Sequence, residues 1–205
     1  MRELATEDSK RQAEVNIGGA TFETHVKNIL NSNAGLIQNN IRVLDRNEVW
    51  GDQNLKSLFS IPIRYTGNNI SDIFLVVQNL ETQKPIVLIS CSMSLHGRFP
   101  LTLFYSLLYK QKMSDLKVVF VTPDKGAKKK GSDNVRHSEW GSHNEPTKPR
   151  ALAEKYLDGV YIDSAYLENV CKFTCDTKIE GALKTFPELI MDLINWKNVG
   201  SAKTG

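Results

Sequence analysis

The sequence predicts a mixed α/β fold in which helices flank a central β-sheet. Three β-branched runs, 72–77 (DIFLVV), 86–90 (IVLIS) and 117–121 (KVVFV), lie in the middle of the chain. Continuous apolar runs of this length are typical of strands buried on both faces. Apolar residues at helical spacing stand before and after them, and 205 residues suffice for one domain with a sizeable core. With no repeat and no linker, we expect a single domain over 1–205.

The composition is that of an ordinary globular protein, with 40% hydrophobic and 24% charged residues. No apolar run reaches the roughly 18 to 20 residues of a membrane span, and the polar N-terminus lacks the apolar segment of a secretory signal. The three cysteines cannot all pair with one another, so we expect free thiols in a reducing cytosol. These features predict a cytoplasmic protein without a membrane partner.

The first elements are a polar arm and a helix. Residues 1–16 are predominantly polar and are expected to form the arm. Phe22, Val26 and Leu30 then recur at helical spacing. Residues 31–40, rich in Asn and Gly, predict a loop or a frayed helix end.

Short strands follow the first helix. Residues 60–65 alternate apolar and polar side chains, as a half-buried strand does. The polar stretch 79–84 separates the runs 72–77 and 86–90 and is short enough for a hairpin. The sequence therefore predicts two adjacent antiparallel strands at the centre of the sheet.

A helix is expected to connect this hairpin to the strand 117–121, which Pro123 stops. Pro100 suits the first turn of that helix. Its inner, apolar face is predicted to consist of Leu101, Phe104, Leu107 and Leu108.

The last third of the chain alternates loop and structure. Residues 124–150 form a long polar segment, and loops of this length are usually functional or disordered. A short helix over 151–156, a strand over 159–162 and a final helix opening at Pro187 are expected after it. The tail 199–205 is expected to be disordered.

Two carboxylates are candidates for chemistry. Asp72 sits at the mouth of an otherwise apolar strand, where an ionised carboxylate is costly to bury unless it is paired or binds a metal. The alternative is an exposed residue that caps a turn. Glu23 lies beside the apolar face of the first helix, and its alternative is a solvated helix-surface residue.

A run of small polar residues, 90–95 (SCSMSL), ends the strand 86–90. A hairpin would bring Asp72 and Ser90 to the same edge of the sheet. Small polar residues at the end of a buried strand are unusual, because each hydroxyl needs a hydrogen-bond partner. The alternative is that these hydroxyls are satisfied within the core.

These blocks resemble a branch of the PD-(D/E)XK restriction endonucleases, over roughly residues 19–125. The third block of that branch typically reads S-C-K-T-S-L-R-E-R, and residues 90–98 read S-C-S-M-S-L-H-G-R. The resemblance implies a restriction-endonuclease-like α/β fold, with a central mixed β-sheet flanked by helices. It also implies the activity of a type II site-specific deoxyribonuclease.

The resemblance further implies roles for the candidate residues. Asp72 matches the first motif carboxylate, which binds Mg²⁺, with Ser71 in place of the motif's proline. Ser90 stands where this branch has lost its second acid, so Glu23 would supply that carboxylate. A backbone carbonyl near Cys91 and waters would complete the oxygen ligands that Mg²⁺ requires. The ion would lower the pKa of a bound water and stabilise charge on the phosphate.

Ser92 departs from the pattern, because it occupies the position of the motif's catalytic lysine. Serine carries no charge and cannot act as a base at neutral pH. Four interpretations stay open at this point. Another cation, Lys84 or Arg98, reaches the site; the activity is weak; the chain is a binding partner; or it is an inactivated form.

A basic cluster predicts contacts with DNA phosphates. Residues 124–136 contain five cationic side chains and two aspartates. Their net charge of +3 equals the formal net charge of the whole chain. The cations are Lys125, Lys128, Lys129, Lys130 and Arg136. Neutralising phosphates releases counterions and strengthens binding at low salt, whereas the alternative is a solvated run of charge. Candidates for reading base edges lie just beyond: His137, Trp140, His143 and Arg150.

Two other chemistries have weaker support in the sequence. Cys171 and Cys175 lack a second pair of ligands for a zinc ion. Cys91 with His25 or His96 would make a Cys/His nucleophile pair, but no third residue stands out to orient it.

The sequence therefore predicts Mg²⁺-dependent, sequence-specific cleavage of double-stranded DNA by a homodimer on a palindromic site. Two alternatives remain. Because of Ser92, the chain could be a catalytically weak DNA-binding or heteromeric subunit of a restriction system; because a fold does not fix a function, it could be a repair-type nuclease on the same fold. The catalytic candidates are Asp72, Glu23, Ser90, Ser92 and Arg98. The candidates for holding the metal are Asp72, Glu23 and Cys91.

Overall fold

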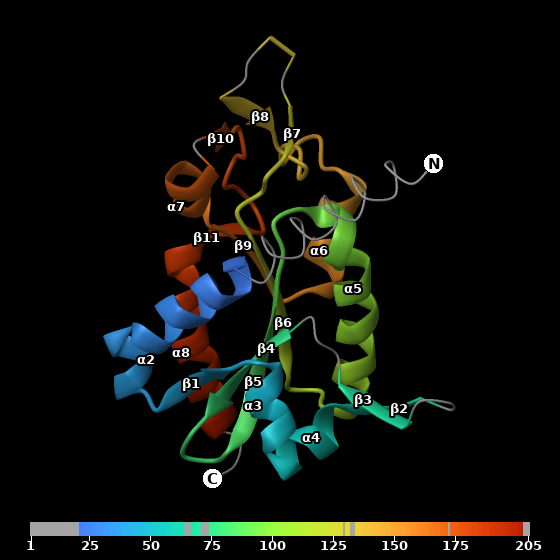
Figure 1. Cartoon of the computed structure of the whole chain (residues 1–205), viewed down its shortest axis with the longest axis vertical. Helices are drawn as coiled ribbons and strands as arrows, with labels where there is room; N and C mark the ends of the chain where they lie inside the picture. The colour runs from blue at the N-terminus through green and yellow to red at the C-terminus, as the bar shows by residue number, and fades with distance from the viewer. Residues whose placement is uncertain are drawn as a thin grey trace, which may run out of the picture.

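A computed structural model of the chain describes residues 21–63, 67–70, 74–128, 130–131, 134–171 and 173–202. Helices lie on both sides of a central sheet, and a small second sheet projects at one end (Figure 1). Within this described part, none of the helices combines the length and the apolar character that a membrane span requires. The predicted polar arm, residues 1–16, lies outside the described residues.

Six strands form the central sheet. In spatial order they are β1 (Ile41–Leu44), β4 (Phe74–Asn79), β5 (Lys84–Cys91), β6 (Lys117–Thr122), β9 (Gly159–Ile162) and β11 (Leu183–Thr185). β4 runs antiparallel to both of its neighbours, whereas β5, β6, β9 and β11 run parallel to one another. The sheet is therefore mixed, as the sequence predicted.

Two layers of helices cover the sheet. A helix over residues 21–32, α2 (Ala34–Gln38) and α8 (Phe186–Ala202) pack on one face. The other face carries α3 (Arg46–Gly51), α4 (Gln53–Phe59), α5 (Leu95–Lys112) and α6 (Lys148–Tyr156). Along β5, Val87 and Ile89 pack in the first layer and Leu88 in the second. Burial on both faces explains why this strand reads as a continuous apolar run.

The central hairpin agrees with its prediction. β4 and β5 pair antiparallel, with Phe74 opposite Ser90. β6 ends directly before Pro123, and β9 occupies the residues expected of it. The strand expected over 60–65 is described as β2 (Ser60–Ile63), which pairs with β3 (Gly67–Ile70) in a separate ribbon.

The start of helix α5 differs from its prediction. The helix begins at Leu95, whose N–H donates to the Glu139 carboxylate at 2.7 Å. This acceptor comes from a distant loop and satisfies one of the free amides of the first turn. Pro100 therefore lies inside the helix and does not open it.

The orientation of α5 is also the reverse of the prediction. Thr102, Ser106 and Tyr109 are buried against the sheet layer. Thr102 Oγ1 and Ser90 Oγ share a hydrogen bond of 2.7 Å, so the hydroxyls on the inner face satisfy one another. The residues predicted to face inward are exposed or only half-buried: Leu101, Phe104, Leu107 and Leu108.

Three other segments are more ordered than the sequence indicated. Residues 31–40 contain α2, whose first turn is capped by the Asn33 side chain. Helix α8 continues through Ala202, past the position at which a disordered tail was expected. The segment 124–150 contains two short strands, β7 (Ala127–Lys128) and β8 (Val135–His137), and β10 (Thr174–Cys175) from later in the chain completes their sheet. Before β10, the chain forms α7 (Ser164–Tyr166) and a π-helical turn, Leu167–Cys171.

Candidate active site

The carboxyl ends of β5, β6 and β9 meet at one edge of the sheet. Cys91 pairs with Val121, and Val121 pairs with Tyr161. Beyond the paired residues, the Ser92 N–H donates to the Val121 carbonyl and the Asp163 N–H donates to the Thr122 carbonyl, each at 3.0 Å. Ligand sites in open α/β sheets lie outside the carboxyl ends of the strands. This edge is therefore where the residues of a site should gather.

Glu23, Arg98 and Cys91 come together at this edge. The apolar face of the first helix is buried through Phe22 and Val26, which fixes Glu23 beside the sheet. Arg98, in the first turns of α5, donates from Nη1 to Glu23 Oε2 at 2.7 Å and to the Cys91 carbonyl at 3.3 Å. The two side chains are 31% and 18% exposed, for Arg98 and Glu23 respectively, so the ion pair is partly shielded from water.

The Cys91 thiol is buried and inert. Burial, and next the negative charge of Glu23, raise the pKa of this thiol well above its ordinary value. A thiol held in its neutral form is neither a nucleophile nor a metal ligand. The structure thus argues against a Cys/His nucleophile pair, and leaves the backbone carbonyl as the group that Cys91 offers to the site.

Asp163 is a further carboxylate at the same edge, and it was not among the candidates predicted from the sequence. Its side chain is 5% exposed. One carboxylate oxygen accepts from the Tyr166 N–H at 3.2 Å, and the other lies 3.3 Å from His25 Nε2. Its position in the sequence could have indicated it as a candidate, because Asp163 directly follows the predicted strand 159–162. Asp72 was selected for a similar position, at the start of an apolar strand.

The donors at the edge suit a hard divalent cation. The Glu23 carboxylate and the Cys91 carbonyl both contact one positively charged group, the Nη1 end of Arg98. Carboxylate and carbonyl oxygens are the ligands that Mg²⁺ prefers. Among the described residues, no three His, Cys, Asp or Glu side chains are grouped closely enough to hold a metal. Asp72 lies outside the described residues, and Phe74, two positions later in the chain, pairs with Ser90.

The basic cluster lies on the small sheet that follows β6. Lys125, Lys128 and Lys130 are exposed, while Lys129 lies outside the described residues. Lys128 pairs with Arg136 across β7 and β8. The Arg136 guanidinium stacks 3.9 Å from the ring centre of Phe173. This end of the molecule thus presents several cations beyond the carboxyl ends of the parallel strands (Figure 1).

Asp124 anchors this loop to the sheet. It is 1% exposed and adopts a positive φ of 52° directly after β6 and Pro123. Its carboxylate accepts from Ser138 Oγ at 2.6 Å, from the Glu139 N–H at 3.2 Å and from Thr177 Oγ1. A buried carboxylate with several donors organises a segment that composition alone assigned to a loop.

Two of the candidates for base reading are structural. Trp140 and Arg150 are both fully buried. Arg150 donates to the Glu154 carboxylate at 2.9 Å and to the Glu180 carbonyl at 2.6 Å, and so joins α6 to the loop before β11. Neither side chain is free to reach a DNA groove, so that prediction was wrong for these two residues.

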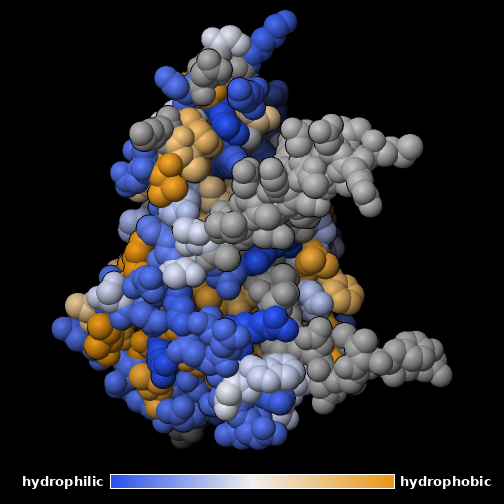
Figure 2. Space-filling view, viewed as in Figure 1, coloured by the Kyte–Doolittle hydropathy of each residue, from blue (hydrophilic) through white to orange (hydrophobic). Residues whose placement is uncertain are grey.

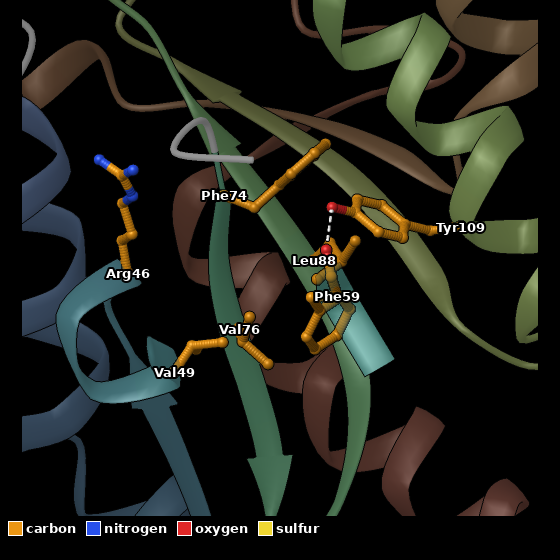
Figure 3. A pocket seen from close by; sticks show the side chains of 7 residues that line it. All are labelled: Arg46, Val49, Phe59, Phe74, Val76, Leu88 and Tyr109. Atoms are coloured by element: carbon orange, nitrogen blue, oxygen red, sulfur yellow. Dashed lines mark hydrogen bonds between the residues drawn. The ribbon is translucent and has the colours of Figure 1, made fainter. Parts of the chain in front are cut away.

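An apolar cavity in the described structure lies in the core layer between the sheet and helices α3, α4 and α5, on the face opposite to the first helix. It is lined by Val49, Phe59, Phe74, Val76, Leu88 and Tyr109, with Arg46 at its side (Figure 3). The Tyr109 hydroxyl donates to the Phe59 carbonyl at 3.0 Å. Arg46 contributes the only charged side chain of this lining, so the cavity offers no set of groups for hydrolysis.

Comparison with known proteins identifies the family. The model of the family described as BsaWI restriction endonuclease type 2 matches residues 53–186, about two thirds of the chain. The chain belongs to this restriction endonuclease family. The fold is similar to that of a solved structure titled as the complex of the specific restriction endonuclease AgeI with DNA. That match has a TM-score of 0.61 and 17% identity, and it covers 91% of this chain and 69% of that one. No curated protein matches the chain.

In this member of the restriction endonuclease family, the two serines of the third block are held by neighbours. Ser90 is fully buried and hydrogen-bonds Thr102, so the alternative of a hydroxyl satisfied in the core applies to it. Ser92 is 9% exposed, and its hydroxyl donates to the Ser94 carbonyl at 2.7 Å. Both hydroxyls are uncharged, so neither of them replaces the positive charge of the motif lysine at this edge of the sheet.

The cation at the edge of this family member, within the described residues, is Arg98. Lys84, the other candidate, is the first residue of β5 and pairs with Asn79 at the opposite end of the hairpin. Seven residues of extended strand separate it from Cys91, a distance of about 23 Å. A lysine side chain cannot span that distance, so Lys84 is excluded as the replacement for the motif lysine.

Proposed function

We propose that this chain is a Mg²⁺-dependent endonuclease that cleaves double-stranded DNA at specific sequences. One observation carries the proposal: the Arg98 guanidinium joins the Glu23 carboxylate and the Cys91 carbonyl at the carboxyl edge of the sheet. This arrangement supplies oxygen donors for a cation and a positive charge for a phosphate at the same point. Membership of a restriction endonuclease family supports hydrolysis of DNA as the reaction.

Asp72, Glu23 and the Cys91 carbonyl would hold the metal ion, which would lower the pKa of a bound water and stabilise the phosphate. Glu23 is positioned by the buried face of the first helix and by Arg98. The Cys91 carbonyl suits the role of a metal ligand because β5 ends at this residue. Among the described side chains, Arg98 donates a hydrogen bond to this carbonyl.

Arg98 would take the part of the missing motif lysine. Phosphodiester hydrolysis builds negative charge on the phosphoryl oxygens, and a positioned cation stabilises that charge. Within the described part of the chain, Arg98 contacts Glu23 and Cys91 through the same nitrogen, Nη1, so its other guanidinium donors could bind a phosphate. A guanidinium offers hydrogen-bond donors and no acceptor, so Arg98 would act as an electrostatic group and not as a base.

The basic cluster would bind the DNA backbone. Lys125, Lys128 and Lys130 project from the loop and small sheet that follow β6. Contacts with phosphates position a protein on DNA without reading its sequence. A cytoplasmic location and DNA as the partner belong to the same proposal, and the solved relative is likewise described as a complex with DNA.

The test uses a supercoiled plasmid incubated with the protein, with Mg²⁺ or with a chelator. Discrete fragments that appear only with Mg²⁺ are the expected result. Asp72→Ala should abolish the fragments while DNA binding persists, and Glu145→Gln, at an exposed position, is the control that should cut normally. Cleavage at the parental rate by Asp72→Ala would contradict the assignment of the site.

A second candidate function, a catalytically weak DNA-binding or heteromeric subunit, is favoured by the environment of Ser92. Its hydroxyl is engaged with the Ser94 carbonyl and offers no charge to the edge. The same plasmid experiment separates the two functions. A shift of the DNA in a gel without any cleavage indicates the binding subunit, and a smear of fragments indicates a repair-type nuclease.

A further inference from the structure

One cation of the small sheet is held differently from its neighbours. Lys125, Lys128 and Lys130 are exposed, whereas Arg136 is half-buried. The Arg136 guanidinium lies 3.9 Å from the centre of the Phe173 ring, a distance at which a cation and the face of an aromatic ring attract each other. The ring therefore fixes the orientation of the guanidinium, while the lysine side chains extend into solvent.

The hydrogen-bond donors of this guanidinium are not used within the described part of the chain. Nε of Arg136 is buried and has no hydrogen-bond partner there, and the side-chain partner of Arg136 is the Phe173 ring. By contrast, Arg98 and Arg150 each pair with a glutamate. Burying a donor without an acceptor destabilises a fold. A stacked arginine in this state is suited to a ligand that brings its own acceptors.

The backbone of Arg136 is fixed on both sides. Strand β8 is the middle strand of the small sheet, between β10 and β7. Arg136 pairs with Cys175 of β10 and with Lys128 of β7. Its carbonyl also accepts a hydrogen bond from the Asp176 N–H at 2.9 Å. Both ends of the Arg136 side chain are thus held, the backbone by the sheet and the guanidinium by Phe173.

Asp124 connects this sheet to the candidate active site. Ser138 follows β8 and Thr177 follows β10, and the buried Asp124 carboxylate accepts a hydrogen bond from each hydroxyl. Asp124 itself lies just beyond the carboxyl end of β6, one of the strands that form the edge. Arg136 is therefore held at a fixed place relative to the edge where a phosphate would be cleaved. A residue that reads sequence needs such rigid support, because recognition has to place the scissile bond at the catalytic groups.

The geometry of a guanidinium selects guanine as the ligand. Its two parallel N–H donors match O6 and N7, the acceptors that guanine presents in the major groove. A pair of strands such as β7 and β8 fits the width of that groove. Hydrophilic residues gather over this end of the molecule, at the top of Figure 2. A phosphate also accepts from arginine, but contact with a phosphate does not require the stacking that holds the guanidinium in one orientation.

We propose that Arg136 is a specificity-determining residue, which reads one guanine of the target site in the major groove. Phe173 is the platform that orients its guanidinium, and the exposed lysines around it contact phosphates. The inference rests on the proposed sequence-specific binding of DNA. It separates two roles within the basic cluster, since base contacts specify a sequence and phosphate contacts only position the protein.

The test is the selection of binding sites by the full chain from a random duplex library, with a chelator present so that no DNA is cut. The parent should select a site with fixed G·C pairs. Arg136→Lys keeps the charge and loses the planar fork. It should lose the preference at one G·C pair and keep the others. Its preference for the selected site over a site changed at that pair should fall roughly 5- to 150-fold, with the salt dependence unchanged.

Lys128→Gln, on the adjacent strand, is the matched comparison. It should weaken binding to both sites alike and flatten the slope of log K against log salt by about 0.9. If Arg136→Lys keeps every preference of the parent, or weakens both sites alike, Arg136 does not read a base. A parent that selects no sequence would also overturn the proposal.

A second variant keeps the test valid if a melting curve shows that Arg136→Lys does not fold. Phe173→Leu keeps an apolar side chain but removes the flat ring, so the preference at the same G·C pair should fall about 2- to 30-fold. An unchanged preference in this variant would contradict the role of the stacked guanidinium. Neither experiment involves cleavage. A failure here leaves the proposed hydrolysis standing, and a failure to cut DNA leaves the reading of guanine standing.

Discussion

Two charged regions of this molecule hold their charges in opposite ways. At the strand edge, Arg98 is fixed by Glu23 and by the Cys91 carbonyl, and the ion pair is partly shielded from water. On the small sheet, Lys128 and Lys130 are exposed to solvent. Shielded charges are weakly screened by salt, whereas exposed charges are screened strongly. We therefore expect single substitutions to matter at the edge and, among the exposed lysines of the small sheet, only the summed charge to matter.

The largest effect is expected at the edge. Glu23→Gln and Arg98→Gln should each lower the rate of DNA cleavage about 10²–10³-fold, because each removes a charged group from the reacting centre. Glu23→Gln should also weaken the response to Mg²⁺, since a carboxylate ligand is removed. The measurement is a single-turnover cleavage rate over a titration of Mg²⁺.

The ion pair of Arg42 and Glu48 provides the control for this prediction. These two side chains are 2.6 Å apart, and Arg42 is 52% exposed. Arg42→Gln should leave cleavage unchanged, because exposed ion pairs contribute little. A combined Glu23→Gln and Arg98→Gln variant should lose less than the product of the single losses, since the two groups contact each other. Fully multiplicative losses would mean that they act separately.

A smaller effect is expected on the small sheet. Replacing Lys128, Lys129 and Lys130 by Gln should flatten the dependence of log K on log salt by about 0.9 for each phosphate that the protein no longer neutralises. Binding should weaken alike for all DNA sequences, because phosphate contacts do not specify. Lys155→Gln, at an exposed position on α6, is the control and should leave the slope unchanged. An unchanged slope in the triple variant would identify the cluster as solvated surface.

The two regions also differ in how far the sequence could predict them. The strands of the edge are continuous apolar runs, a pattern that survives in any tertiary context, and the pairing of Phe74 with Ser90 follows from the short hairpin. The small sheet depends on β10, whose Thr174 pairs with Val135 of β8, far earlier in the chain. Asp124 similarly joins Ser138 and Thr177. No local pattern encodes contacts at such separations.

Helix α5 shows a further limit of periodicity. The spacing of Leu101, Phe104 and Leu107 predicted the helix correctly, but the face that it predicted to be buried is exposed. The helical period identifies which residues share a face, but it does not say whether that face meets the sheet or another molecule. The inner face was decided by the hydrogen bond between Thr102 and Ser90, a tertiary contact.

The smallest effect is expected from restoring the motif lysine. In the parent background, Ser92→Lys should change the cleavage rate by less than about tenfold, because Arg98 already places a cation beside Glu23. In the Arg98→Gln background the same substitution should recover at least about tenfold of the missing rate. This comparison asks whether the two positions supply the same charge, which neither single variant can answer.

The environment of Ser92 determines how this experiment can fail. The residue is 9% exposed, and its hydroxyl donates to the Ser94 carbonyl, a hydrogen bond that the substitution removes. If the lysine stem reaches the carboxylate of Glu23, the ammonium is paired and the melting temperature should fall by only a few degrees. An ammonium left buried without a partner would cost about 3–5 kcal/mol, equivalent to roughly 6–20 °C for a chain of this size. A fall in melting temperature of that size, without recovery of the cleavage rate, would show that the side chain at position 92 points away from the edge. The absence of a lysine at this position would then no longer support Arg98 as the cation of the site. That assignment would depend only on the hydrogen bond between Arg98 and Glu23.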